Sequence, residues 1–221
     1  METILEKLKE CIIVGKINAV SPFPAEMKGQ DGTDELTKLA LQQGISPTDV
    51  MNALIAGMDV VGQRFTENKI FVPQMLISAR AMNASMSHLR AYFNSGEIKR
   101  KGVFILGTIF GDLHDIGKNL CAMMIEGAGW EVVDLGVDVS AEKFIGKLQE
   151  HPDAVIGISA LLTTTMSNMG AVIKEIKELS PKTKIIVGGA PLSAEYAESI
   201  GADAYGRDPQ ESVKWLETLV A

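Results

Sequence analysis

Residues 102–119 of the 221-residue chain read GVFILGTIFGDLHDIGKN, a short apolar run, a polar loop and the start of a second apolar pattern. The first apolar run is typical of a strand in a parallel sheet that is covered by helices on both faces. The loop then places Asp112, His114 and Asp115 among glycines, and apolar residues at helical spacing follow it. The stretch therefore predicts the first strand, loop and helix of an α/β domain.

The rest of the C-terminal half repeats this alternation of β-rich and helical runs. Strands are expected at 102–109, 130–135, 153–159, 184–188 and 203–205. Helices are expected between and after them, at about 116–128, 140–150, 166–179, 192–200 and 209–219. The alternation predicts a flavodoxin-like (Rossmann-like) domain over residues 102–221, with a five-stranded parallel sheet in the order 2-1-3-4-5.

Helical periodicity dominates the N-terminal half of the chain. It is clearest in one set of apolar residues that share a helical face, namely Val72, Met75, Leu76, Ala79, Met82, Met86, Leu89 and Phe93. A second helix is expected to begin at Ser46 and to run to about Phe65. Pro47 suits its first turn, and Asp49 completes something close to a capping box with Ser46.

Two shorter helical patterns complete this half. They lie at residues 2–14 and 33–43, separated by a loop at 18–32 that is rich in Pro and Gly. Four helices of these lengths pack most simply as a small bundle. We therefore expect a four-helix bundle cap domain over residues 1–95, a polar hinge at 96–101, and then the sheet domain.

Charge and composition narrow the class of protein. A formal net charge of −7 with scattered Lys and Arg argues against a nucleic-acid partner, because phosphate binding needs clustered positive charge. No apolar run reaches membrane-spanning length, and the N-terminal METILEKLKE does not read as a signal peptide. The two cysteines, Cys11 and Cys121, have no zinc-ligand spacing and suit a reduced compartment. We therefore expect a cytoplasmic protein with no membrane partner.

Polar and glycine-rich loops follow three of the expected strands. In such a sheet, ligands bind beyond the carboxyl ends of the strands, where the strand order reverses, here between the first and third strands. The loop after the third strand, SALLTTTM at 159–166, carries a serine and three threonines. The fourth strand ends in Gly188 and Gly189, where no Cβ keeps a ligand from the backbone. We expect these loops and the His114 segment to form one crevice.

The same residues carry a family resemblance. Asp112-x-His114-x-x-Gly117, 41 residues, Ser159-x-Leu161, 26 residues and Gly188-Gly189 together resemble the cobalamin-binding motif of methionine synthase, certain mutases and corrinoid methyltransferase proteins. The segment VVGQRFTENKIFVPQMLISARAM resembles the helical cap of methionine synthase and of the corrinoid proteins of methanol and methylamine systems. Residues 18–32 depart from the family pattern by being longer and richer in Pro and Gly.

The resemblance implies a role for the residues around the cobalt. His114 would replace the cofactor's own nucleotide base as the cobalt ligand, Asp112 would hold the second ring nitrogen, and Thr165 would hold Asp112. On the opposite face of the corrin, Phe65 and Val72 would form a lid over the methyl group, although apolar helix residues are more often bundle core.

The nucleotide tail of the cofactor would enter the sheet domain. The resemblance places Ser159 and Thr163 against the base of the tail, and Gly188 and Gly189 against the tail itself. The motif positions Gly117 and Leu161 and the neighbouring Asp115 are grouped with them as cofactor-binding residues. Asp115 and Lys118 also read as ordinary helix N-terminal and exposed residues. The remaining candidates, His88, His151, Cys11 and Cys121, are expected to be structural.

The resemblance implies a corrinoid methyl carrier that is not catalytic by itself. A substrate-specific methyltransferase would load a methyl group onto cob(I)alamin, and a second methyltransferase would pass it from methylcobalamin to tetrahydrofolate or a thiol coenzyme. A reductive activator is a further expected partner. A cobalamin-dependent sensor and a mutase subunit are the alternatives. The sequence identifies neither the methyl donor nor the final acceptor.

Overall fold

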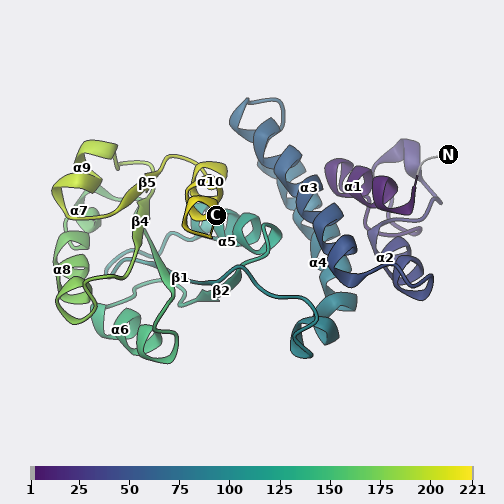
Figure 1. Cartoon of the computed structure of the whole chain (residues 1–221). Coiled ribbons are helices and arrows are strands. Elements are labelled where there is room, and N and C mark those ends of the chain that lie inside the picture. The colour runs from purple at the N-terminus through teal and green to yellow at the C-terminus, as the bar shows by residue number, and fades with distance from the viewer. Residues whose placement is uncertain (1–2, 221) are drawn as a thin grey trace. The chain divides into compact units, whose positions relative to one another are not determined.

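The computed structural model describes residues 3–220, and the main boundary between its two compact units falls between Arg100 and Lys101 (Figure 1). The first unit is helical, with α1 (Ile4–Val14), η1 (Ala25–Met27, a 3-10 turn), α2 (Thr33–Gln42), α3 (Pro47–Thr66) and α4 (Val72–Asn94). It contains the four expected helices, while residue 2 of the expected first helix lies outside the described residues.

The second unit alternates strands and helices, as the sequence predicts. Its strands are β1 (Val103–Thr108), β2 (Glu131–Asp134), β3 (Val155–Ser159), β4 (Ile185–Gly188) and β5 (Ala204–Gly206). Its helices are α5 (Ile116–Gly127), α6 (Ala141–Glu150), α7 (Thr163–Met166), α8 (Met169–Leu179), α9 (Ala194–Ser199) and α10 (Pro209–Val220). All strands are parallel in the order β2-β1-β3-β4-β5, which confirms the predicted fold class and strand order.

Two helices of the first unit begin in different ways. Thr3 and Glu6 form a reciprocal capping box at the start of α1. Ser46 is the N-cap residue of α3, as predicted, but the predicted capping box is wrong, because the Ser46 side chain makes no capping hydrogen bond. Pro47 occupies the first turn of α3 and has no N–H, so this helix start has one donor fewer to satisfy.

Polar side chains join α2 to α4 inside the first unit. Thr33 Oγ1 donates to the Ala81 carbonyl at 2.8 Å, and Thr37 Oγ1 donates to Ser85 Oγ at 2.9 Å. At the end of this row, His88 Nε2 lies 2.6 Å from Asp34 Oδ1. His88 therefore has a structural role, as expected, with a partner that the sequence did not reveal.

The register of the sheet aligns one residue from each of four strands at its carboxyl edge. Thr108 pairs with Ser159, Ser159 with Gly188, and Gly188 with Gly206. Two residues in this row are glycines and the other two carry hydroxyls, whereas the strand residues before them are largely apolar and buried. The loops that leave this row form the candidate site.

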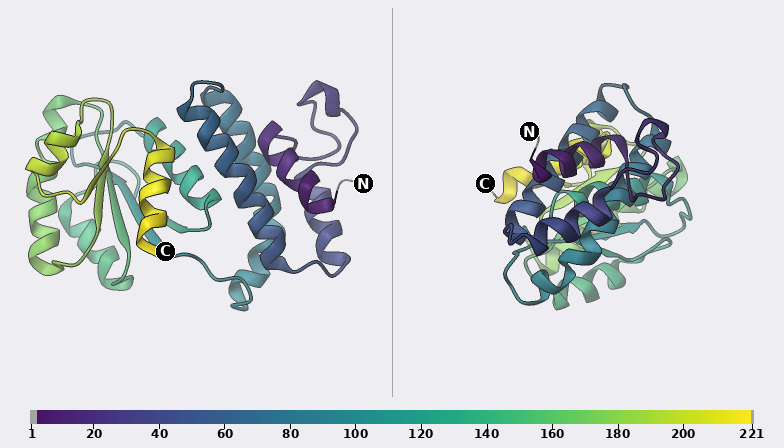
Figure 2. Two further views of the ribbon diagram at one scale, coloured as in Figure 1. Left: turned by 45° about the horizontal axis from the view of Figure 1, so that its top comes forward. Right: turned by 90° about the vertical axis from the view of Figure 1, so that its right-hand side faces the viewer.

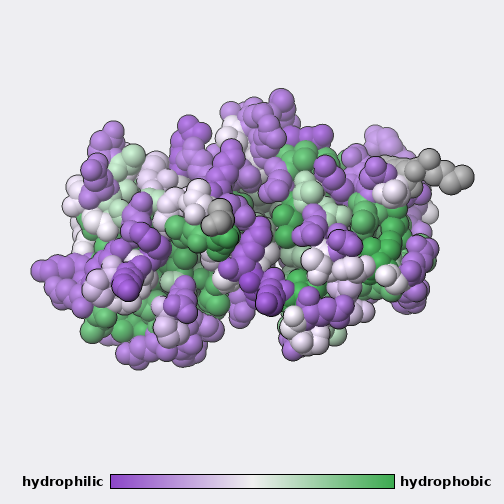
Figure 3. All heavy atoms as spheres, in the orientation of Figure 1, coloured by the Kyte–Doolittle hydropathy of each residue, from purple (hydrophilic) through white to green (hydrophobic). Residues whose placement is uncertain are grey.

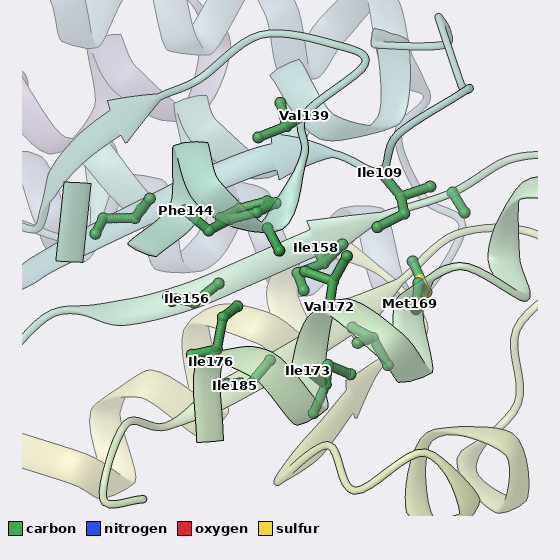
Figure 4. Close-up of a cluster of buried hydrophobic side chains, with 14 of the residues drawn as sticks. Ile109, Val139, Phe144, Ile156, Ile158, Met169, Val172, Ile173, Ile176 and Ile185 are labelled. Carbon is green, nitrogen blue, oxygen red and sulfur yellow. The ribbon is translucent and has the colours of Figure 1, made fainter. Parts of the chain in front are cut away.

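Helices cover both faces of the sheet. The face covered by α6 and α8 buries a continuous apolar core that includes Phe144, Ile156, Ile158 and Ile173 (Figure 4). Helices α5 and α10 lie on the opposite face (Figure 2). Strands buried in this way are expected to be apolar along their whole length, which is the pattern seen in the sequence.

The helix expected at about 166–179 is present as α8 (Met169–Leu179), and the sequence did not predict the short helix α7 that precedes it. Helix α7 begins at Thr163, and the amides of Thr165 and Met166 both donate to the Leu162 carbonyl. The chain then breaks at Ser167 and Asn168 before α8, and the Asn168 side chain donates to the Phe110 carbonyl instead of capping the helix.

The surface of each unit mixes hydrophobic and hydrophilic residues, as one face shows in Figure 3. Among the described residues, no helix combines the length and apolar character needed to cross a membrane.

Candidate functional site

A cavity of about 590 Å³ opens at the carboxyl edge of the sheet. Its walls come from β1, α5, the segments that follow β3, β4 and β5, and the start of α10. The predicted residues that line it are His114, Asp115, Gly117, Ser159, Leu161, Gly188 and Gly189. The structure therefore brings together the three motif segments that are widely separated along the chain.

The other predicted residues lie elsewhere. Asp112 and Thr165 are buried behind His114, and Thr163 is exposed at the start of α7 and does not line the cavity. Phe65 and Val72 are partly buried in the helical unit, at the end of α3 and the start of α4. Their role as a lid stays a prediction.

Asp112 holds the His114 ring in a defined orientation. Oδ1 of Asp112 lies 2.7 Å from His114 Nδ1 and also accepts the His114 amide at 3.0 Å. The two contacts fix both the backbone and the ring of His114. Nδ1 is the nitrogen that faces the carboxylate, whereas Nε2 has no hydrogen-bond partner within residues 3–220. Since the His114 side chain is 50% exposed at the cavity, Nε2 is available to a ligand.

The second oxygen of Asp112 is held by three donors. Thr165 Oγ1 donates to Oδ2 at 2.7 Å, and the backbone amides of Leu161 and Leu162 donate at 2.8 and 3.3 Å. Burial alone raises the pKa of Asp112, but the hydrogen bonds from Thr165, Leu161 and His114 outweigh it and hold the pKa well below its ordinary value. Asp112 is therefore a carboxylate at neutral pH. It favours the His114 tautomer that carries its proton on Nδ1, which leaves Nε2 as the basic nitrogen.

Sequence reasoning missed Thr108, the last residue of β1. Its hydroxyl donates to the His114 carbonyl at 2.9 Å and lies 3.0 Å from Ser159 Oγ, so it joins the loop after β1 to the end of β3. The available signal was a hydroxyl residue that interrupts an otherwise apolar strand.

The expectation that Lys118 is exposed is wrong. Its side chain is only 2% exposed, and Nζ contacts Asp134 Oδ2 at 2.5 Å and Asn119 Oδ1 at 2.8 Å. The first turn of α5 directs Lys118 toward the carboxyl end of β2 and the cavity wall. A lysine so deeply buried is tolerated because its ammonium group is paired.

Cys121 also lines the cavity, although it was expected to be structural only. Burial raises the pKa of its thiol to about 11, so the group stays protonated at neutral pH. A protonated thiol is a poor metal ligand and nucleophile, which agrees with a role in the cavity wall.

Replacing Thr165 with Val keeps the shape of the side chain but removes the hydroxyl that donates to Asp112. Loss of this bond to a buried carboxylate is expected to lower the free energy of unfolding of the sheet unit by about 1.5–3 kcal/mol at pH 7. Because the folded pKa of Asp112 is below its unfolded value, the contribution is complete above about pH 4 and declines as the pH falls toward the folded pKa. The deficit should therefore shrink below about pH 4.

Urea unfolding followed by tryptophan fluorescence measures this deficit, since both tryptophans, Trp130 and Trp215, belong to the sheet unit. Thr165→Ser is the matched control, because it keeps the hydroxyl and should stay within about 1 kcal/mol of the original protein. A deficit that is independent of pH, or one shared by Thr165→Ser, would show that the hydroxyl does not act on Asp112.

The fold and the site together define a class of protein. A helical unit followed by a flavodoxin-like sheet, with a carboxylate-held histidine beside an apolar cavity, is the arrangement of a two-domain cofactor-binding protein. A family model described as a B12 binding domain matches residues 102–214, and a second model with the same description matches residues 30–90. The chain belongs to the family of B12-binding corrinoid proteins.

Individual relatives agree with this assignment. The dimethylamine corrinoid protein 1 of Methanosarcina mazei is 38% identical, with 99% of this chain and 97% of that protein covered. A cobalamin-binding protein from Desulfitobacterium hafniense has a similar structure, with a TM-score of 0.77, 25% identity and complete coverage of both chains. The methanol:cobalamin methyltransferase complex MtaBC from Methanosarcina barkeri contains a chain with a TM-score of 0.80 and 27% identity, covering 98% of this chain and 79% of that one.

The residues present fit cobalamin, which this protein binds. His114 presents Nε2 as a nitrogen ligand, and the adjoining cavity is large and predominantly apolar. At Gly117, on the cavity wall, an added Cβ would meet no atom within 4 Å, so the glycine leaves space that a bound group can occupy. When bound, the cofactor supplies a cobalt centre that accepts and releases a methyl group.

Proposed function

We propose that this corrinoid protein is a methyl carrier that receives a methyl group from a substrate-specific methyltransferase and delivers it to a second methyltransferase. The observation that carries the proposal is the His114–Asp112 pair at the cavity, where Asp112 holds Nδ1 and leaves Nε2 for the cobalt. The similarity to a chain of the MtaBC complex supports a methyltransferase as the partner.

The protein's own residues would perform four tasks in this function. His114 would bind the cobalt through Nε2, and Asp112 would hold the proton on Nδ1. The hydroxyl of Thr165 and the amides of Leu161 and Leu162 would keep Asp112 charged, which strengthens its hold on the ring. Ser159, Gly188 and Gly189 would line the channel for the nucleotide tail.

The helical unit completes the proposal. We propose that Phe65 and Val72 shield the methyl group as a lid, in a cap domain at 1–95 that is joined by a hinge at 96–101 to the cofactor domain at 102–221. Such a lid must move aside when a partner enzyme takes the methyl group. We further propose that the protein works with a second methyltransferase, which acts on the acceptor, and with a reductive activator. We also propose that it is cytoplasmic.

A cobalamin-dependent sensor is the weaker alternative. The relatives that match over nearly their whole length include the dimethylamine corrinoid protein 1 of Methanosarcina mazei and the trimethylamine corrinoid protein 1 of Methanosarcina acetivorans. This relationship favours methyl transfer, and a methylated amine is accordingly our proposed class of methyl donor.

The proposal is tested by the dependence of methyl transfer on a partner. The protein loaded with hydroxocobalamin and reduced should turn over negligibly with a methylamine and a thiol acceptor, because in this proposal the partner enzymes activate both the donor and the acceptor. Adding the methyltransferases that copurify from the native source should raise the rate by roughly a hundredfold or more, since they position donor and acceptor at the cobalt. Methylated thiol, measured by mass spectrometry, reports the transfer.

Two controls make this experiment decisive. The methyltransferases without the corrinoid protein should be inactive, and free hydroxocobalamin should not replace it at equal concentration. Steady multiple turnover by the isolated chain would contradict the carrier function. Absence of transfer with the complete set of proteins would contradict it as well.

A further inference from the structure

The segment 136–139, between β2 and α6, runs beside the loop 109–114, which we term the His114 loop. The Thr108 amide donates to the Gly136 carbonyl at 3.0 Å, and the Val139 amide donates to the Thr108 carbonyl at 2.9 Å. In addition, the Asp138 amide donates to the Asp112 carbonyl at 3.0 Å. The segment thus extends the edge of the sheet alongside the His114 loop.

Asp138 makes a second, side-chain contact with the same loop. Its Oδ1 accepts the Gly111 amide at 2.8 Å, although the two residues lie far apart in the chain. Asp138 itself has a φ of 55°, in the left-handed region that disfavours residues with a Cβ and that Asp and Asn tolerate better than most. Backbone conformations of this kind persist where their surroundings hold them, and they gather at functional sites.

The His114 loop is also held from its other side and from its end. Asn168 Nδ2 donates to the Phe110 carbonyl at 3.1 Å, and Thr108 Oγ1 donates to the His114 carbonyl at 2.9 Å. Neither Asp138 nor Asn168 belongs to the buried core. Their contacts therefore restrain the loop without contributing to the packing of the sheet.

We infer that Asp138 is a positioning residue that holds the His114 loop so that Nε2 of His114 meets the cofactor in one orientation. The inference rests on the proposed ligand role of His114. The carboxylate oxygen of Asp138 accepts the amide of Gly111, one residue before Asp112, and the Asp138 amide donates to the Asp112 carbonyl. Because Asp112 in turn holds the ring of His114, these two hydrogen bonds would also fix the nitrogen that binds the metal.

Two substitutions separate the side-chain acceptor from the backbone conformation. Asp138→Gly keeps a residue that favours the left-handed region but removes the acceptor, whereas Asp138→Asn keeps both an amide oxygen acceptor and tolerance of that region. Asp153→Gly is the matched control, because Asp153 is an exposed residue of the turn before β3, at the opposite edge of the sheet.

The first measurement uses the protein without cofactor. The Gly111 amide donates to Asp138 Oδ1, and the His114 amide donates to Asp112 Oδ1. Hydrogen exchange of both amides should accelerate by about tenfold in Asp138→Gly. Asp138→Asn and Asp153→Gly should stay within about twofold of the original rates. An unchanged rate in Asp138→Gly would overturn the inference whatever the cofactor does.

The second measurement uses the protein loaded with hydroxocobalamin and reduced to the cob(II) form. Electron paramagnetic resonance of Asp138→Gly should show roughly a tenth or more of the cobalt without nitrogen splitting, as the loop samples other orientations. Asp138→Asn should retain the full splitting. Full splitting in Asp138→Gly, or equal loss in Asp138→Asn, would overturn the positioning role of the acceptor.

The cob(II) spectrum of the original protein shows whether a negative result contradicts the role of Asp138 alone or also the proposed ligand role of His114. If its own cob(II) spectrum lacks nitrogen splitting, His114 is not the ligand, and both the ligand role and the positioning role fall together. If the original protein shows the splitting and Asp138→Gly shows the same spectrum, only the positioning role falls.

Discussion

Replacing His114 with Ala should remove the nitrogen ligand from cobalt. In the cob(II) form of the original protein, the imidazole nitrogen is expected to split each cobalt line of the electron paramagnetic resonance spectrum into three, and this splitting should disappear in His114→Ala. The physical reason is that the described residues bring no other imidazole to the cavity wall. Protein loaded with hydroxocobalamin and then reduced by one electron provides the measurement.

The variant should nevertheless retain corrinoid through gel filtration, because the cavity walls at Ser159, Gly188 and Gly189 are unchanged. His151→Ala is the control, since His151 lies at the end of α6 and does not line the cavity. Unchanged splitting in His114→Ala would show that another group binds the cobalt. Loss of splitting in His151→Ala would show that the spectrum does not report on this ligand.

A methyl group added at Gly189 is expected to have the largest effect on the sheet unit. A Cβ at this position would lie 1.8 Å from the Ala160 carbonyl oxygen, and the residue has a φ of 131°, which side chains rarely adopt. The obstacle is backbone, held by the hydrogen bond from the Ala160 amide to the Gly188 carbonyl, so it cannot move aside cheaply. Gly189→Ala should lower the free energy of unfolding by about 3–5 kcal/mol and abolish corrinoid retention.

Gly117→Ala is the matched substitution for this prediction. An added Cβ there would meet no atom within 4 Å in the protein, so the stability should change by no more than about 1 kcal/mol. The same methyl group would project into space beside the cavity, and corrinoid retention should fall. Urea unfolding by tryptophan fluorescence and absorbance after gel filtration measure the two effects. A Gly189→Ala protein of normal stability would contradict the close approach of β3 and β4.

Local spacing made much of the fold predictable. Apolar runs of strand length alternate with helical periodicity after residue 102, and this alternation predicted all five strands and their order. The departures occurred where a contact from another segment changed the local pattern. The short helix α7 precedes the expected helix α8, and the Asn168 side chain between them donates to the Phe110 carbonyl.

The candidate site was predictable to the extent that its residues belong to a spaced motif. His114, Ser159 and Gly188 were placed at one crevice from the position of their loops after parallel strands, and they line one cavity in the structure. Thr163 was grouped with them from the sequence of its loop, yet α7 leaves it exposed. The direction in which each side chain leaves a short helical turn decides which threonine is buried and which is exposed. A run of three threonines does not show that direction.

The amino-acid pattern was sufficient to predict the class of fold, the strand order, the family and the loop that carries His114, because periodicity, motif spacing and residue type can be read directly along the chain. The folded structure was needed to see that Lys118 is buried against Asp134, that Thr108 joins the His114 loop to β3, and that Asp138 Oδ1 accepts the Gly111 amide. Each of these contacts depends on a side-chain direction or a strand register that forms when separate segments pack. Hydrogen bonds of this kind require atoms to meet within about 3 Å, a condition that sequence spacing does not specify.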